Sequence, residues 1–260
     1  DSDPAKTRIE VLNTLQMIYD SYTAFNYPEL GRKKSGEVYH MIEENVKGVI
    51  KTILELSTDL NKVNNRIVLR DSLLEKRKQG IVDPLIFHDL NAQIENLIDS
   101  INIKTSYLYP SIPSISQALE NLKELLKSNI NKTAICMEKI DIEDKELLSK
   151  IIVIQRELEA QEQMIETIKI LIDEIIIPFS TSASKSGNPR NYKEVITKQA
   201  ENRALIERFK FVVTNLKEKF LREELKNRMM KSIKYISDVI KELNKIIEAE
   251  SNQYQERKAA

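Results

Sequence analysis

Glycine, proline and tryptophan are scarce in this chain of 260 residues, which has five glycines, seven prolines and no tryptophan. A β-sandwich or β-barrel needs many tight turns rich in glycine and proline, so these folds are disfavoured. The sequence also has no glycine-rich loop of the kind that holds phosphates in α/β nucleotide-binding folds. Hydrophobic residues make up 41% of the chain and charged residues 31%, which is typical of long amphipathic helices.

Other absences exclude kinds of partner and chemistry. The single cysteine, Cys136, allows neither an intramolecular disulfide nor a cysteine-based zinc site. Forty basic residues balance forty acidic ones, whereas binding to nucleic acid by counterion release usually requires a basic excess. We therefore expect no nucleic-acid partner. No run of about 18 uncharged apolar residues is present, so we expect no ordinary transmembrane helix.

The longest regular hydrophobic pattern runs from Tyr39 to Leu74. Its apolar residues recur in steps of three and four over five heptads, with one polar interruption at Arg70. This pattern predicts a single helix over residues 37–79, which would be roughly 60 Å long. The positions of this seam are Tyr39, Ile42, Val46, Val49, Ile53, Leu56, Leu60, Val63, Ile67, Arg70 and Leu74.

Similar patterns divide the rest of the chain into helices. Asp3 and Asp83 each precede a proline and are expected to cap a helix, and Gly80 is expected in the left-handed conformation after a helix end. The hydrophobic register shifts between Leu221 and Leu225, which predicts a stutter or kink in the last helix. The expected elements are a short helix (4–24), a long helix (37–79), a helical hairpin (84–139), a long helix (141–177) and a long helix (189–250).

These elements predict an all-α fold, an elongated antiparallel helical bundle or coiled coil of three long helices with shorter helices at one end. We expect one domain over residues 1–260. The hairpin is expected to turn at the proline-rich segment 109–113, and the helix over 141–177 to end at Pro178. Its apolar stripe is wider than a two-stranded seam, which predicts burial among several neighbours within one chain. The polar tail from Ser251 is expected to be frayed.

No catalytic or metal-binding constellation is evident. His40 and His88 are the only histidines, and only His40 has a glutamate, Glu37, three residues before it. A di-iron site in a helical bundle needs two such pairs, so we expect both histidines to be solvated and no metal or cofactor to be bound. Cys136 has no histidine or asparagine beside it and is expected to be a small core residue. The chain is therefore predicted not to be an enzyme.

Acidic residues on the expected helices have basic neighbours three or four positions away. Examples are Glu43 with Lys47 and Glu224 with Arg228. Such pairs are typical of a solvated, charged helix face rather than of a catalytic carboxylate pair.

Two apolar clusters fall at the joints between expected helices. One flanks Asp83-Pro84 and the other flanks Pro110. They either fasten each joint to the bundle or form an apolar surface for a partner or a lipid interface. The residues predicted to make such contacts are Ile81, Val82, Leu85, Phe87, Tyr107, Leu108, Tyr109 and Ile112.

Long helices at 37–79, 141–177 and 192–249, with short helices between them, resemble the α-helical pore-forming toxins. The xenorhabdolysin-like two-component branch is the most similar, because one of its components need not carry an obvious hydrophobic membrane hairpin. The resemblance lies in the architecture and not in a residue motif. It implies a secreted, soluble monomer that oligomerises with a partner at membranes. The alternative is a coiled-coil scaffold or tether of the kinetochore, cytoskeletal or vesicle-tethering kind, which would be cytoplasmic or nuclear.

Overall fold

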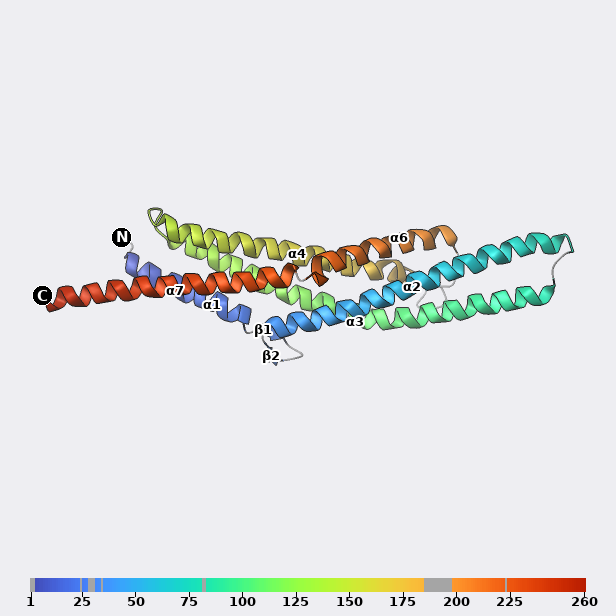
Figure 1. Cartoon of the computed structure of the whole chain (residues 1–260), viewed down its shortest axis with the longest axis horizontal. Helices are drawn as coiled ribbons and strands as arrows, with labels where there is room; N and C mark the ends of the chain where they lie inside the picture. The colour runs from blue at the N-terminus through green and yellow to red at the C-terminus, as the bar shows by residue number, and fades with distance from the viewer. Residues whose placement is uncertain are drawn as a thin grey trace. The chain divides into compact units, whose positions relative to one another are not determined.

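The computed structural model describes residues 3–23, 25–27, 31–33, 35–80, 83–184, 198–222 and 224–260. Helices account for nearly all of them (Figure 1), which confirms the predicted all-α class. Two three-residue strands, β1 (Phe25–Tyr27) and β2 (Gly31–Lys33), form an antiparallel ribbon with Asn26 opposite Arg32. The predicted elements left residues 25–36 between two helices, because runs this short have no periodicity to detect.

Two helices begin where the sequence predicted, at Pro4 and Pro84, whereas the long helices predicted from residues 37, 141 and 189 begin at Ser35, Lys145 and Gln199 in the described residues. A carboxylate oxygen of Asp3 accepts a hydrogen bond from the Ala5 amide at 3.1 Å, and Asp83 accepts one from Leu85 at 3.0 Å. Gly80 has a φ of 80°, the left-handed conformation expected after a helix end. The helices are α1 (Pro4–Thr23), α2 (Ser35–Lys78), α3 (Pro84–Lys139), α4 (Lys145–Ser184), α6 (Gln199–Leu216), the π-helical turn η2 (Lys217–Leu221) and α7 (Glu224–Ala259).

The predicted hairpin over 84–139 is wrong. α3 is one helix of 56 residues that continues through both Pro110 and Pro113. Leu108, Ile112 and Ile115 are all buried, and their spacing of four and three residues places them on one face of a continuous helix. Neither proline has a backbone N–H, so the helix lacks two of its hydrogen bonds. Burial of the apolar face compensates for this loss, and both prolines lie on the exposed side of the helix.

Two helix ends also differ from the predictions. α4 continues past Pro178 to Ser184, although proline was expected to end it. α7 stays helical to Ala259, so the expected fraying from Ser251 is wrong. The expected break in the last long helix is confirmed, because the π-helical turn separates α6 from α7 next to the register shift. A π turn inserts one extra residue, which is how a helix absorbs such a shift.

The chain contacts divide the protein into two compact units, each assembled from distant segments. Unit 1 consists of residues 1–42, 118–168 and 222–260, and unit 2 consists of residues 43–117 and 169–221. The unit boundaries fall inside α2, α3 and α4, so each of these helices belongs to both units. A single domain over 1–260 stays a prediction.

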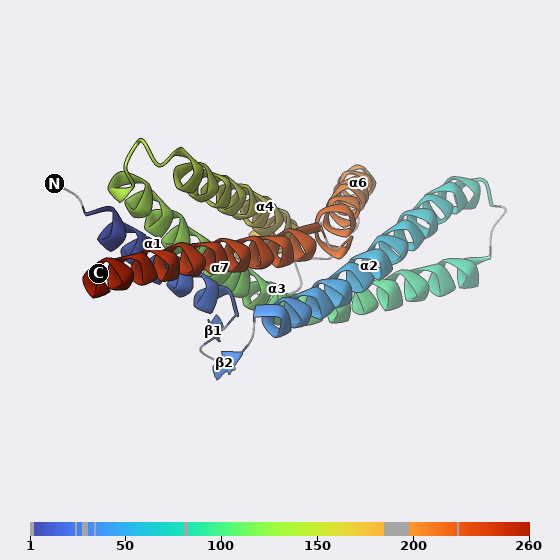
Figure 2. The same ribbon diagram turned by 60° about the vertical axis from the view of Figure 1, so that its left-hand side comes forward.

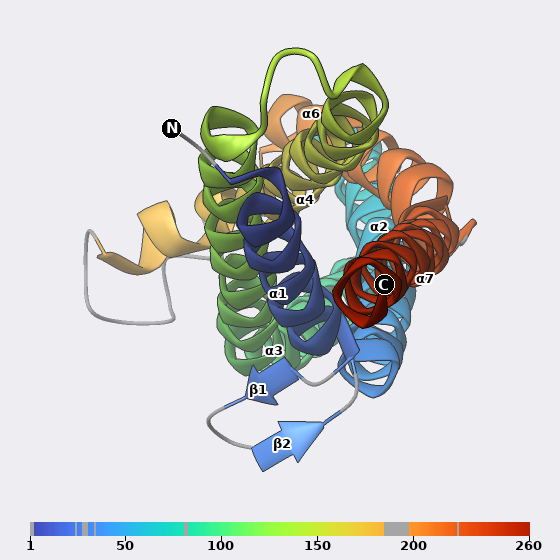
Figure 3. The same ribbon diagram turned by 90° about the vertical axis from the view of Figure 1, so that its left-hand side faces the viewer.

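Unit 1 is built from α1, the C-terminal part of α3, the N-terminal part of α4, and α7. α1 packs along α7, the first of these helices against the last (Figure 3). The central apolar positions of α4 are buried as predicted, among them Ile151, Leu158 and Ile165, whereas Val153 on the edge of the stripe is exposed. Arg8 on α1 forms ion pairs with Asp144 and Glu250.

Unit 2 contains an antiparallel pair formed by α2 and the N-terminal part of α3 (Figure 2). Three contacts show the pairing along its length. Asp59 accepts a hydrogen bond from Ser100 at 3.0 Å, Arg66 donates to Gln93 at 2.7 Å, and the Arg77 guanidinium lies 5.3 Å from the Phe87 ring centre. The predicted seam of α2 is buried from Ile42 to Ile67, whereas Leu74 is exposed and the Tyr39 side chain lies outside the described residues.

Among the described residues, no helix combines the length and apolar character that crossing a bilayer requires.

Candidate functional site

The eight residues predicted to contact a partner or a membrane do not form one surface. Leu85 and Tyr107 are 68% and 69% exposed, but they lie 22 residues apart on α3, about 33 Å along the helix axis. Ile81 and Val82 lie outside the described residues. The buried or half-buried members are Phe87, Leu108, Tyr109 and Ile112. These four therefore pack within the chain, and contact of this set with a partner or a membrane stays a prediction.

Exposed apolar side chains nevertheless occur along both helices of the unit 2 pair. Ile86 lies next to Leu85, and Ile103 lies one turn before Tyr107. Those on α2 are Leu54, Val68, Leu69 and Leu74. At the end where α2 meets α3, the apolar side chains lie beside Lys76, Arg77 and Lys78, the basic last turn of α2.

The two histidines do not form a metal site in the described part of the chain. Both His40 and His88 are exposed, and no group of three or more candidate metal ligands occurs among the described residues. The Glu37 side chain lies outside those residues. Cys136 is buried, and burial raises the pKa of its thiol despite the opposing effects of a Thr14 hydrogen bond and Lys139. A thiol with a raised pKa is a poor nucleophile, which agrees with a core role.

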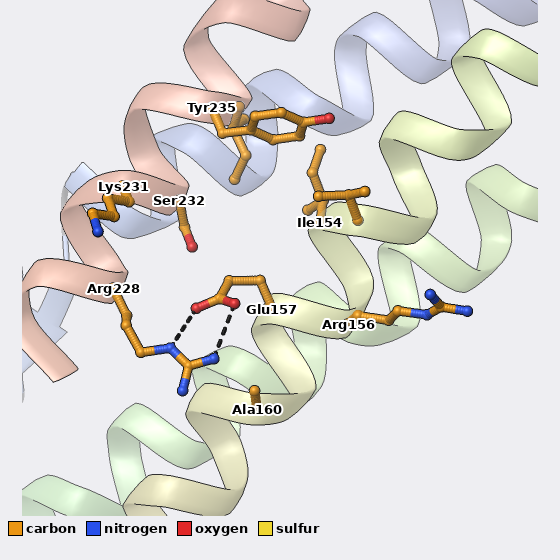
Figure 4. Close-up of a pocket in the computed structure, with 10 residues that line it drawn as sticks. Ile154, Arg156, Glu157, Ala160, Arg228, Lys231, Ser232 and Tyr235 are labelled. Carbon is orange, nitrogen blue, oxygen red and sulfur yellow. Dashed lines mark hydrogen bonds and ion pairs between the residues drawn. The ribbon is translucent and has the colours of Figure 1, made fainter. Parts of the chain in front are cut away.

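A groove with convergent polar groups lies in unit 1, between α4 and α7. It has a volume of about 630 Å³ and is lined by residues of 153–160 on α4 and 228–236 on α7. Its apolar lining includes Ile154 and Ile236, which are almost fully buried, and Val153, which is 47% exposed. The Tyr235 ring lies above Ile154 at one end of the groove (Figure 4).

An ion pair crosses this groove. The Arg228 guanidinium donates to both carboxylate oxygens of Glu157, through Nε at 2.8 Å and through Nη2 at 3.0 Å (Figure 4). The remaining terminal nitrogen of Arg228 lies 3.2 Å from the sulfur of Met164. Such bidentate pairs fix both distance and orientation, so this contact sets the register of α7 against α4. The sequence had indicated Glu224 as the partner of Arg228, but the pairing between helices takes both Glu157 oxygens instead.

Beneath the ion pair, a buried polar chain connects three helices. The fully buried Gln161 on α4 accepts a hydrogen bond from the Tyr22 hydroxyl of α1 at 2.9 Å, and its amide nitrogen donates to the Ser232 hydroxyl of α7 at 2.8 Å. Gln161 also donates to Glu157 at 3.3 Å, which joins the chain to the ion pair. Each polar group in this core therefore has a partner, as burial requires.

Three pKa shifts follow from this geometry. The Arg228 hydrogen bonds hold the pKa of Glu157 below its ordinary value, against the opposing effect of partial burial. The same contact raises the pKa of Arg228. Burial raises the pKa of the Tyr22 phenol, and the nearby Glu157 carboxylate raises it further. Glu157 therefore remains ionised and Tyr22 remains neutral, so neither is poised to exchange a proton near neutral pH.

Unit 2 has polar contacts between helices of the same kind. The buried Asp59 of α2 accepts hydrogen bonds from Ser100 and from Lys104, the latter at 2.6 Å. The buried Asn202 of α6 donates to Asn64 of α2 at 2.9 Å. These contacts fix the pairing of helices and add no chemical group to the groove.

Sequence reasoning found little of the groove. Gln161 was visible as a polar residue within the apolar register of α4, which was a signal for a buried polar contact. Tyr22, Glu157 and Ser232 carried no such signal, because their partners lie 71 to 139 positions away in the chain.

Comparison of the chain with known protein families, characterised proteins and solved structures gives no significant match.

Proposed function

We propose that the chain is a non-enzymatic helical protein that acts by assembling with a partner protein. The observation that supports this best is the set of large apolar side chains on the helix pair of unit 2. Leu85, Ile86 and Leu74 lie exposed near the α2–α3 connection, and Ile103 and Tyr107 lie further along α3. Grouped apolar side chains at a surface mark sites of interaction more often than isolated ones do.

Its first candidate role is as a component of an α-helical pore-forming toxin that oligomerises with a partner at membranes. The α2–α3 connection supports this role, because exposed Leu85 and Ile86 lie at the same end of the helix pair as the basic residues 76–78. Apolar side chains beside a basic cluster suit the surface of an anionic bilayer, where they enter the interface and the cations meet the head groups.

The second candidate is a coiled-coil scaffold or tether. The C-terminal end of α7 supports it, because residues 251–259 are helical and exposed on every side. A helix that extends past its own core has faces on which another helix can pack. The two candidates differ in whether a membrane or only a protein partner is engaged.

Liposome flotation, combined with sedimentation velocity, tests the proposal. The toxin role predicts flotation with phosphatidylglycerol-containing vesicles but not with pure phosphatidylcholine. The variant L85E/I86E should remain at the bottom of the gradient. The control variant I135E, at an exposed isoleucine of α3 in unit 1, should still float.

The other outcomes separate the candidates. Absence of flotation together with a stable complex in solution favours the scaffold role. A chain that stays monomeric, floats with no vesicle and recovers no partner in cross-linking experiments contradicts assembly in both forms.

A further inference from the structure

The exposed face of α3 carries no charge over four turns in unit 2. Between residues 100 and 117 the only charged residue is Lys104, although charged residues make up 31% of the chain. The Lys104 side chain is only 25% exposed, and it forms an ion pair with Asp59 of α2 at 2.6 Å. The exposed residues of this segment, which we call the uncharged stripe, are Ile103, Ser106, Tyr107, Pro110, Pro113, Ser114 and Gln117.

The uncharged stripe is one continuous surface. Its residues recur every three or four positions, so they share the side of α3 that lies opposite the buried Leu108 and Ile112. From Ile103 to Gln117 the stripe is about 21 Å long. Ile103 and Tyr107 are 56% and 69% exposed. A surface that lacks charge and contains an exposed tyrosine has the composition of the core of a protein interface.

The two prolines of the stripe favour a contact outside the chain. Each removes a backbone hydrogen bond from α3, and both are exposed, so their rings contribute little to the core of unit 2. Residues that weaken their own helix at a surface are typical of sites where function limits stability. A proline side chain also loses no rotamer entropy when a partner covers it.

The absence of charge decides which kind of partner suits the stripe. Nucleic acid and anionic lipid head groups are attracted by cations, and the stripe has none. A charged protein surface would lose its hydration here without gaining an ion pair. A second copy of the same stripe has neither disadvantage, because two uncharged surfaces bring no like charges together.

An antiparallel arrangement makes the stripe complementary to itself. When two copies of α3 pack antiparallel about Pro110, residues equally far before and after Pro110 lie level with each other. Tyr107 of one copy then lies level with Pro113 of the other, and Ser106 lies level with Ser114. Each of these contacts occurs twice, as two-fold symmetry requires. The small serines allow the two helices to approach closely.

The charged residues beside the stripe agree with this register. Antiparallel packing places Asp99 level with Asn121 of the second copy and Lys104 level with Ser116, so no like charges meet. Parallel packing would instead place each of these charges level with its own counterpart. The antiparallel arrangement is therefore the favoured one.

We propose that the uncharged stripe of α3 is a homodimer contact in which two copies of the chain pack antiparallel about Pro110. The inference rests on the proposed function, assembly with a protein, and names a second copy of the chain as a partner. Seven residues of each copy take part, whereas a standard interface uses about 20–30 on each side. The dimer is therefore weak and reversible.

Sedimentation equilibrium of the full chain, up to millimolar concentration, tests the proposal with charges placed at two exposed serines. S106E/S114E places glutamates level with glutamates, and we expect the dissociation constant of the dimer to rise tenfold or more. S106K/S114E places each lysine level with a glutamate of the other copy, so this variant should dimerise at least as tightly as the native chain. Circular dichroism confirms that each variant is folded.

Two control variants carry new charges outside the stripe. S251E changes an exposed serine of α7 in unit 1 and should leave dimerisation unchanged. L85E/I86E, which should abolish flotation, should also leave dimerisation unchanged. It therefore separates the homodimer contact from the membrane contact proposed above.

Cross-linking gives a second measurement that needs no added charge. P110C should form a disulfide between two copies under mild oxidation, because residue 110 meets its own counterpart at the two-fold axis. S251C should remain largely uncross-linked under the same conditions.

Three results would overturn the proposal. One is a chain that stays monomeric at millimolar concentration; flotation or binding of another protein by that monomer would leave the proposed function intact. Another is dimerisation that S106E/S114E leaves unchanged, which would place the interface elsewhere. The third is equal weakening by S106E/S114E and S106K/S114E, which excludes the antiparallel register. A monomeric chain whose flotation is abolished by S106E/S114E would replace the second copy by a lipid surface.

Discussion

Glu157 and Arg228, separated by 71 positions in the chain, face each other across the α4–α7 groove and form two hydrogen bonds, at 2.8 and 3.0 Å. Each side chain is about one-third exposed, at 33% and 32%. Solvent therefore screens the attraction, and the pair contributes to register more than to the free energy of unfolding.

A double-mutant cycle measures this pair. We expect R228Q to lower the free energy of unfolding by about 1 kcal/mol and the coupling to E157Q to be roughly 0.5–1 kcal/mol. The exposed pair of Lys47 and Glu44, at 3.2 Å and half exposed on both sides, is the matched control and should couple by close to zero. Urea denaturation of the single and double variants of both pairs measures the two coupling free energies. Equal coupling in the two pairs would mean that the bidentate geometry adds nothing.

The lowered pKa of Glu157 makes stability depend on pH in a defined direction. A carboxyl group with a lower pKa in the folded state contributes stability that is fully present above its unfolded pKa, about 4.3, and is lost as pH falls through the folded value. E157Q should therefore reduce the loss of stability below about pH 4.3, because the amide has no proton to gain. We expect the difference between the denaturation midpoints of the native chain and E157Q to shrink as the pH is lowered from 7 to 3. Parallel curves would contradict the assignment.

Gln161 should be more sensitive to substitution than its exposed neighbours. Q161L leaves the buried Tyr22 hydroxyl and the Ser232 hydroxyl without their shared partner, and we expect a loss of about 1–3 kcal/mol in unfolding free energy. Adding Y22F removes one of the orphaned groups, so the double variant should recover part of that loss. Q161L with native stability, or a further loss in the double variant, would show that this polar chain does not stabilise unit 1.

The prolines inside α3 give a test of the unbroken helix. P110A supplies an amide that can donate to the Ser106 carbonyl, and we expect the unfolding free energy to rise, by up to about 3 kcal/mol. P4A is the control, because proline is tolerated at the first position of α1 and its replacement should change stability little. A chain that turned at residues 109–113 would instead lose stability with P110A.

The long seams were predictable because they repeat. From Ile42 to Ile67 each third or fourth residue of α2 is apolar and buried, and such a pattern needs no knowledge of its partner. The caps at Asp3 and Asp83 and the left-handed Gly80 were predictable for a similar reason, since each involves a few neighbouring residues.

Interactions between distant residues were not predictable. Pro110 and Pro113 were expected to break α3, and only the burial of Leu108, Ile112 and Ile115 by other segments shows why the helix continues. In the same way, Arg228 had an adequate local partner in Glu224, and nothing in the sequence favoured Glu157. Local patterns predict which residues form helices. They do not predict how the helices align against one another, and the polar contacts between helices depend on that alignment.

The interleaving of the two units has a consequence for synthesis. α1 packs along α7, and roughly 200 residues separate these helices in the chain. Unit 1 therefore cannot complete its folding while the ribosome is still making the segments in between. Until α7 is made, the apolar face of α1 stays exposed. Ribosome-bound nascent chains halted before α7 should bind chaperones and resist compaction, and no single cut in the gene can release either unit intact.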